Sequence, residues 1–194
     1  MYHTTITTNS LPMPEFIKRY QEQEKFMAYC KECPNYNTLW SCPPLQFAAN
    51  DLLQGFNYIN LVAVKVIYDK ETIKLADTPE KVKEITTCSL REVKSKLAEA
   101  ILALEGEFPG GVGLASGGCH LCEHCTRPDD LLCRMPEKMR YSLDSFGFDL
   151  TAITAELLQI ELKWTHSGLP EYYTLIHALM TKEPMGNRLN TIAI

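Results

Sequence analysis

The amino-acid sequence predicts an α+β fold in which helices cover one face of a small β-sheet. A chain of 194 residues, 45% hydrophobic and 22% charged, has the size and composition of one globular domain, so we expect a single domain over residues 1–194. Helical and strand patterns alternate irregularly along it, with one long helix between two strands. Most of its eight cysteines fall in two irregular segments, which are expected to be loops beside the sheet.

The first third of the chain is expected to contain two helices, a loop and a strand. Residues Met1–Asn9 are polar, and we assign them no element. Met13–Tyr29 mixes apolar and charged positions as an amphipathic helix does. Cys30–Pro44 is the first cysteine loop, because its prolines block a regular helix or a central strand. Leu45–Leu53 is expected to form a short helix, and the Val-, Ile- and Leu-rich run Tyr58–Tyr68 a mostly buried strand.

The most strongly marked element is a helix from Pro79 to Gly106. Its apolar stripe recurs at helical spacing through charged residues and consists of Val82, Ile85, Val93, Leu97, Ile101 and Leu104. A glycine-rich segment follows, in which Val112–Ala115 is a candidate second strand. This strand leads directly into Cys119–Cys133, the second cysteine loop.

The last third is expected to contain two short helices and a strand. Pro136–Phe146 is the first helix, stopped by a glycine, and Thr151–Leu158 is the second, with Asp149 or Thr151 as its cap. Tyr172–Met180 is the last strand, and the tail after it has no predicted structure. Because the second loop leaves a strand and the first is tied to the same sheet by a short connection, we expect the two loops to lie near each other.

Charge and cysteine content narrow the function classes. The net charge of -5 gives no global basic field, so neither nucleic acid nor an anionic membrane surface is an expected partner. The N-terminus shows no basic stretch before an apolar run, and no apolar segment is long enough to span a membrane. We therefore expect a cytoplasmic protein, and in that reducing compartment eight cysteines point to metal binding rather than to disulfides.

The second loop has the spacing of an iron-sulfur site. Cys119, Cys122 and Cys125 form a CxxCxxC run, and Cys133 supplies a fourth thiolate from the same loop. This spacing occurs in bacterial ferredoxins that bind [4Fe-4S] clusters. Zinc is the alternative, although zinc sites more often use two separated CxxC pairs.

The first loop offers three thiolates, from Cys30, Cys33 and Cys42, and no obvious fourth. It is expected to hold a [4Fe-4S] cluster with one open iron, a zinc ion with a non-cysteine ligand, or a site that exchanges a thiolate with the second loop. The exchange has precedent in two-cluster ferredoxins, where a Cys before Pro binds the other cluster, and Cys42-Pro43 has that form. Cys88 is expected to be a small buried side chain within the long helix.

The motifs CPNYNTLWSCPP, CHLCEHC and LCRMPEKMRYSLDSFGFDL resemble those of the family labelled predicted metal-binding protein (domain of unknown function 2284). The resemblance covers Cys30 to Asp149, and the matching positions are Cys30, Cys33, Tyr36, Cys42, Pro43, Pro44, Cys119, Cys122, Cys125, Cys133, Arg134, Pro136, Glu137, Ser142 and Gly147. It implies a metal or iron-sulfur site without specifying a reaction. The family usually has Tyr-Gly after the first CxxC, whereas this chain has Tyr36-Asn37. Asparagine tolerates the left-handed conformation, so we expect the turn to be kept.

A few other residues are candidates for contact with a cluster. Arg134 follows a ligand and is the cation expected to stabilise an anionic cluster, while Ser142 is expected to donate to a cluster sulfur or to cap a turn. His120 and His124 flank Cys122 and are expected to lie at the surface or beside the site rather than to bind metal. The glycines before the loop do not match a nucleotide-binding pattern and suit close backbone approach to a cluster instead.

The sequence thus favours an iron-sulfur protein with one or two [4Fe-4S] clusters, working in electron transfer or redox sensing with a partner redox protein. Two other classes stay open. One is a zinc-binding structural or adaptor protein, and the other is an enzyme that binds its substrate at an open iron of the first loop. Of the remaining histidines, His166 is expected in a loop and His177 in a strand.

Overall fold

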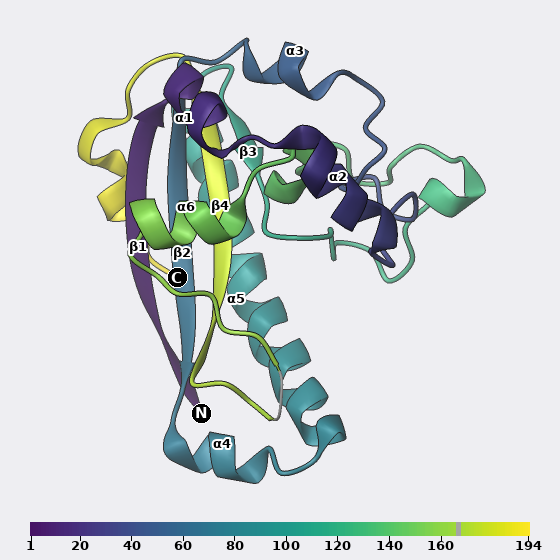
Figure 1. Ribbon diagram of the computed structural model, residues 1–194, viewed down its shortest axis with the longest axis vertical. Helices are drawn as coiled ribbons and strands as arrows, with labels where there is room; N and C mark the ends of the chain where they lie inside the picture. Colours follow the sequence, from purple (N-terminus) through teal and green to yellow (C-terminus); the bar gives the residue numbers. More distant parts are fainter. Residues whose placement is uncertain (166–167) are drawn as a thin grey trace.

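The computed structural model describes residues 1–165 and 168–194, and His166 lies outside them. The described residues form a four-stranded antiparallel sheet with the strand order β1-β2-β4-β3 (Figure 1). The strands are β1 (Tyr2–Pro12), β2 (Tyr58–Tyr68), β3 (Val112–Leu114) and β4 (Tyr172–Thr181). With helices packed on this sheet, the predicted α+β class is confirmed.

The helices stand before, between and after these strands in the chain. The α-helices are α1 (Met13–Tyr20), α2 (Gln23–Glu32), α3 (Ala49–Leu53), α4 (Lys70–Leu75), α5 (Pro79–Glu107) and α6 (Leu150–Leu157). The 3-10 turns are η1 (Arg127–Asp129), η2 (Leu143–Phe146) and η3 (Gly186–Thr191). The predicted long helix and the strand Tyr58–Tyr68 are confirmed.

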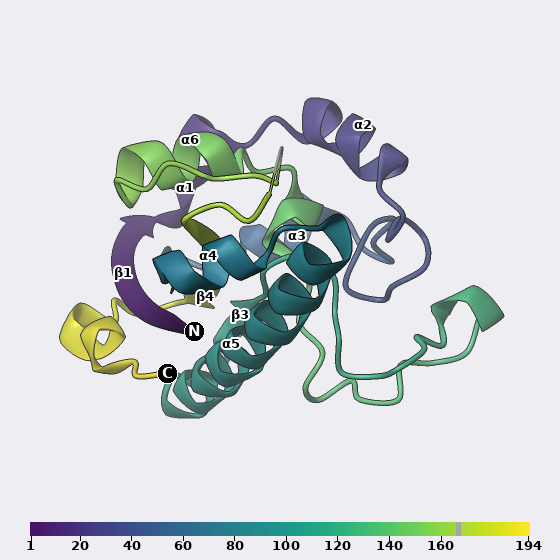
Figure 2. The same ribbon diagram turned by 90° about the horizontal axis from the view of Figure 1, so that it is seen from below.

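Helices cover both faces of the sheet, so the prediction of helices on one face alone is wrong. On one face, Leu61 of β2 packs in a hydrophobic cluster with Phe16 of α1 and Ile153 of α6. On the other, Val62 packs in a second cluster with Leu97 of α5. Figure 2 shows the sheet between α5 on one side and α1 and α6 on the other. Successive residues of a strand point to opposite faces of the sheet. Because helices cover both faces, almost all of β2 is apolar and buried.

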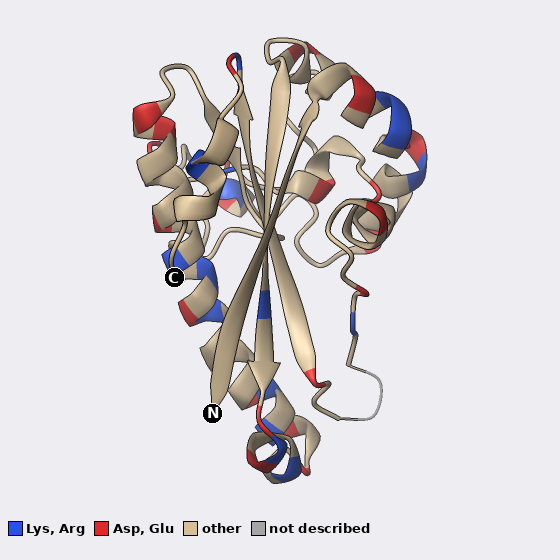
Figure 3. Cartoon of the chain, turned by 90° about the vertical axis from the view of Figure 1, so that its left-hand side faces the viewer, with Lys and Arg blue, Asp and Glu red and all other residues tan. Residues whose placement is uncertain are grey.

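Charged side chains are nearly excluded from the sheet. Figure 3 shows lysine, arginine, aspartate and glutamate residues on the helices and loops, while the strands are almost free of them. The exception is Lys65 of β2, whose ammonium lies 4.8 Å from the centre of the Tyr172 ring. The sheet is therefore the apolar framework from which the loops project.

The edge strand β1 was not predicted. It pairs along its whole length with β2, from Tyr2 opposite Tyr68 to Pro12 opposite Tyr58. Most of its residues are exposed or only partly buried, so the segment has a polar composition. Its threonines and Ile6 favour the extended conformation, and an edge strand tolerates polar side chains.

The predicted helix Met13–Tyr29 is two helices. Between them, Gln21 is extended and forms an isolated bridge with Phe148, and its side-chain amide donates to the Phe146 carbonyl at 2.9 Å. These bonds compete with helix continuation at this point. The break redirects the chain so that α2 carries Cys30 toward the loops.

The predicted helix Pro136–Phe146 is also wrong. Its backbone is irregular up to Ser142, which forms a parallel bridge with Ala115, and only the turn η2 follows. The helix after it is confirmed as α6, with the Asp149 carboxylate accepting from the Ala152 amide at 2.9 Å.

Three smaller differences complete the picture of the elements. Of the predicted helix Leu45–Leu53 only α3 forms, and α4 and the tail turn η3 were not predicted.

Among the helices that the structure describes, none combines the length and the apolar character needed to cross a membrane.

Candidate metal centre

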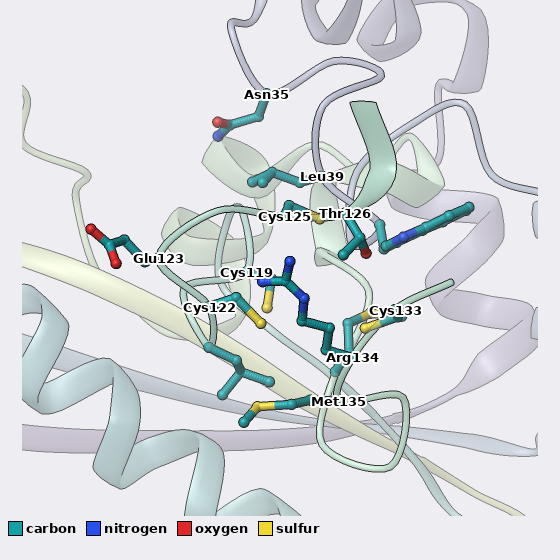
Figure 4. Close-up of a pocket in the computed structure, with 13 residues that line it drawn as sticks. Asn35, Leu39, Cys119, Cys122, Glu123, Cys125, Thr126, Cys133, Arg134 and Met135 are labelled. Atoms are coloured by element: carbon teal, nitrogen blue, oxygen red, sulfur yellow. The ribbon is translucent and has the colours of Figure 1, made fainter. Parts of the chain in front are cut away.

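The four cysteines of the second loop surround one cavity. Cys119, Cys122, Cys125 and Cys133 are all partly buried, and all line a hollow of about 230 Å³. Figure 4 shows their side chains facing a common space in which the Arg134 side chain also lies. The first loop contributes to the same wall through Asn35, Leu39 and Trp40. The predicted ligands of the second loop are therefore brought together, with the first loop beside them.

The three cysteines of the first loop lie at the end of α2 and in the turn after it. Cys30 is in the last turn of α2, Cys33 caps it and is exposed, and Cys42 is buried. Burial, followed by the charges of Asp144, Cys33 and Cys42, raises the pKa of the Cys30 thiol to about 11. Burial also raises the pKa of Cys42, although its hydrogen bond with Ser41 acts in the opposite direction. These thiols are thus near enough to influence one another, and a bound cation is what would favour their thiolate forms.

The donors of the second loop line one cavity but are not at coordination distance. In the ranges that the structure describes, no three histidine, cysteine, aspartate or glutamate side chains stand close enough to hold one metal ion. All eight cysteines are free thiols, which is the chemical form that thiolate ligands require. The chemistry of the donor set fits a thiolate-bound metal.

The first loop is closed by Asn37 in the left-handed conformation. Its φ is 56°, and its amide donates to the Pro43 carbonyl at 2.8 Å. The expectation that asparagine keeps the turn in place of glycine is confirmed.

Ser41 ties the two loops to each other. Its hydroxyl accepts a hydrogen bond of 2.8 Å from the amide of Cys119. Its carbonyl accepts from the Ser142 amide at 2.9 Å and from the Ser145 hydroxyl at 3.0 Å. The residue before Cys42 thus holds the first cysteine of the second loop as well as η2. The prediction that the loops lie near each other is confirmed.

Gly118 lets the loops approach this closely. A Cβ at this position would stand 2.5 Å from Leu39 Cδ1 and 2.9 Å from Asn35 Nδ2, well inside normal contact distance. The close approach that we expected for the glycines of this segment is therefore to the other loop.

Arg127 is a second tie between the loops, and sequence reasoning did not select it. Its guanidinium is buried and donates to the carbonyls of Leu39, Cys42 and Pro44 while lying 5.2 Å from the Trp40 ring. This fork geometry suits arginine and not lysine. The only signal in the sequence is its place two residues after Cys125.

Two residues were predicted to contact a cluster. One of them, Arg134, lines the cavity, whereas the other, Ser142, is buried and is not part of its lining. Arg134 is exposed and donates to the His124 carbonyl at a long 3.4 Å, although it borders the cavity. Ser142 is buried, and its hydroxyl donates to the Asp144 carboxylate at 3.2 Å rather than to a cysteine or to the backbone of the turn.

Lys94 of α5 is a partly buried cation beside both loops. Its ammonium donates to the carbonyl of Gly118. Burial lowers the pKa of Lys94, whereas the charges of Cys119, Cys42 and Asp144 act to raise it. A buried ammonium needs anionic neighbours, and thiolates from both loops are within its reach. No sequence pattern indicates this role, because Lys94 is one of many charged residues on the helix.

The remaining candidates lie at the margin. His120 is half-buried, with Nε2 3.0 Å from the Ser95 hydroxyl, and His124 is exposed. Cys88 is exposed on α5, so its predicted burial is wrong. The stripe that faces the sheet includes Val93 and Leu97, and Cys88 lies off that face.

The comparisons with known proteins agree with this chemistry at the level of the family. None of the curated proteins and none of the solved structures matches the chain. The model of the family described as predicted metal-binding protein (DUF2284) matches residues 17–178, a range that includes both cysteine loops and most of the sheet. The chain belongs to this family of predicted metal-binding proteins.

Proposed function

We propose that the protein binds a [4Fe-4S] cluster through Cys119, Cys122, Cys125 and Cys133 and uses it for one-electron transfer or redox sensing. The observation that carries the proposal is the cavity that these four cysteines line together. Its volume of about 230 Å³ is several times the ~30 Å³ that one water molecule takes up in the liquid, so it suits a group of several atoms better than a single ion. The CxxCxxC spacing supports the same cofactor.

The surroundings of the cavity suit a redox cluster. Leu39, Trp40 and Met139 line the wall beside the sulfurs and reduce the access of water. Lys94 supplies positive charge from α5, and Arg134 supplies it from the loop. Apolar shielding and nearby cations are the means by which a protein sets the potential of a thiolate-bound cluster.

The first loop is proposed as a second metal site with Cys30, Cys33 and Cys42 as ligands. We place the protein in the cytoplasm, with a redox protein as its partner and no role for nucleic acid or membrane, because free thiols in this number suit a reducing compartment.

Anaerobic purification followed by counts of iron, acid-labile sulfide and zinc tests the proposal. We expect a brown protein with iron and sulfide in equal amounts and an electron paramagnetic resonance signal after reduction. The variant Cys122→Ser should lose the signal of the second loop, whereas Cys88→Ser, a matched change at an exposed thiol, should keep it. A colourless protein that contains zinc and no sulfide would establish the structural or adaptor function in place of the redox one. A spectral change of the reduced protein on addition of small anions would point to the enzyme with an open iron.

A further inference from the structure

One carboxylate oxygen beside the first loop has no hydrogen-bond partner. Asp144 is part of η2, and its Oδ1 is buried and unpartnered among the residues that the structure describes. Within the same described ranges, its other oxygen accepts a side-chain hydrogen bond only from the Ser142 hydroxyl, at 3.2 Å. A buried carboxylate without full pairing is costly, and proteins usually retain one where it meets a cation or a metal. Burial accordingly raises the pKa of Asp144.

The surrounding elements place Asp144 near two of the first-loop cysteines. η2 packs against α2, which carries Cys30, and the carbonyl of Ser41, next to Cys42, accepts hydrogen bonds from both ends of the turn. The charge of Asp144 acts on the thiols of both Cys30 and Cys42. The carboxylate thus lies within electrostatic reach of two of the three first-loop cysteines.

The contact between η2 and α2 is tight and leaves little freedom. Gly147, which ends the turn, has a φ of 76°, and a Cβ there would lie 2.5 Å from Gln23 Cα. The amide of Glu22 donates to the Gly147 carbonyl at 2.9 Å. The turn that carries Asp144 is therefore fixed by its backbone against the start of α2, the helix that carries Cys30.

We infer that the Asp144 carboxylate is the fourth ligand of the metal site formed by Cys30, Cys33 and Cys42. The inference rests on the proposed metal site of the first loop and names the donor that the three cysteines lack. Zinc and iron both accept carboxylate oxygen beside thiolate, and a bound metal would give the unpartnered Oδ1 its missing partner.

The other thiols on the chain are less suited to this position. Cys88 is exposed and lies in a surface groove with residues of α5, among them Glu84 and Arg91. Cys119 lines the cavity of the second loop. Lys94, whose ammonium is near Cys42 and Asp144, supplies the positive charge that three thiolates and a carboxylate around one metal need.

Substitutions at Asp144 with metal analysis of the anaerobically prepared full chain test this assignment. Asp144→Asn removes the anionic donor with almost no change of shape, and Asp144→Cys replaces it with a thiolate. We expect Asp144→Asn to lose the metal of the first site, or one iron of its cluster, while the second site keeps its iron, sulfide and spectrum. Asp144→Cys should retain the first-site metal and gain thiolate charge-transfer absorption. Asp130→Asn, at an exposed aspartate of the second loop, is the control and should change neither site.

The possible results separate the inference from the proposed function. Full first-site metal in Asp144→Asn, with an unchanged spectrum, would overturn the inference, as would loss of that metal in both Asp144 variants. Neither result would affect the cluster of the second loop. A wild-type chain that binds no metal at either loop would instead refute the proposed function itself.

Discussion

Lys94 illustrates how one side chain can act on both cysteine loops. Its ammonium is within electrostatic reach of Cys42 in the first loop and of Cys119 in the second, and it is held there by the Gly118 carbonyl. Thiolate ligands leave a bound metal or cluster with excess negative charge, so a nearby cation stabilises the loaded state more than the free one. The residue acts through the ligands and need not touch the metal.

Replacing Lys94 with methionine should therefore weaken metal binding. We expect the affinity to fall about 10–100-fold, as is typical for the loss of a group that supports metal ligands. The measurement is a competition with a chelator of known affinity. Lys96→Met is the matched control on the same helix, because Lys96 is half-exposed and pairs only with Glu92 at the surface. Equal affinities for the two variants would contradict the role assigned to Lys94.

His177 gives the protein a pH dependence of its own. It lies in β4 with both ring nitrogens buried and without partners in the described part of the chain. Burial, and then the charges of Lys94 and His120, lower its pKa to about 3. The unfolded chain, with a histidine pKa of about 6.5, binds this proton more readily than the fold does, so stability is full above about pH 6.5 and falls toward pH 3.

His177→Leu should remove this part of the acid sensitivity. Between about pH 6.5 and 4 we expect the free energy of unfolding of the wild type to fall by on the order of a few kcal/mol more than that of the variant. Urea unfolding at a series of pH values measures both curves. Metal release in acid affects the two proteins alike, so it cancels in the difference. If the two curves are parallel, His177 takes up its proton in the folded protein as readily as in the unfolded chain, and the prediction is wrong.

At the scale of elements, the sequence predicts whatever depends on local periodicity. The apolar stripe of α5 and the buried runs of β2 and β4 are visible because each repeats a pattern over many residues. β1 is hidden because an edge strand needs no apolar composition. The helix expected over Pro136–Phe146 does not form, because Ser142 makes a long-range bridge with Ala115 that no local pattern indicates.

The sequence likewise predicts one part of the candidate site and misses another. Cysteine spacing predicted two groups of candidate ligands, and connection lengths indicated that the loops would meet. Ser41, Lys94, Arg127 and Asp144 were missed, because each contributes through partners far along the chain or on another element. A residue whose role depends on tertiary contacts leaves no periodic or spacing signal.

Arg127→Lys tests whether the loops depend on the hydrogen bonds that Arg127 makes between them. Lysine keeps the charge but cannot reach three carbonyls with one planar group, so buried carbonyls of the first loop lose their donors. We expect the free energy of unfolding to fall by about 1–3 kcal/mol and metal to dissociate faster from both loops. Urea unfolding and the rate of metal loss to a chelator measure these effects. Arg134→Lys, at an exposed arginine with one long hydrogen bond, should change stability by less than about 0.5 kcal/mol. A similar loss of stability in both variants would show that the hydrogen bonds of Arg127 between the loops do not stabilise the fold.

For the molecule as a whole, the hydrophobic core and the loops are separate structures. Both hydrophobic clusters are built from the sheet and from the helices and turns around it. Neither cluster contains a described residue between 30 and 44 or between 119 and 133. The loops rest on this framework through hydrogen bonds and, in the proposed function, through their metals.

Removal of metal should therefore loosen the loops and leave the sheet folded. In hydrogen exchange of the chelator-treated protein, we expect amides such as those of Cys42 and Cys119 to lose their protection, because their bonds to Leu39 and Ser41 lie within the loops. Amides of β2, which is paired with β1 on one side and β4 on the other, and the β4 amides that bond to β2 should exchange as slowly as before. Small domains built around a structural zinc behave differently, since their whole fold depends on the metal. Loss of protection throughout the sheet on chelation would show that the metals hold the entire domain together, and that burial around β2 and β4 is not sufficient for folding.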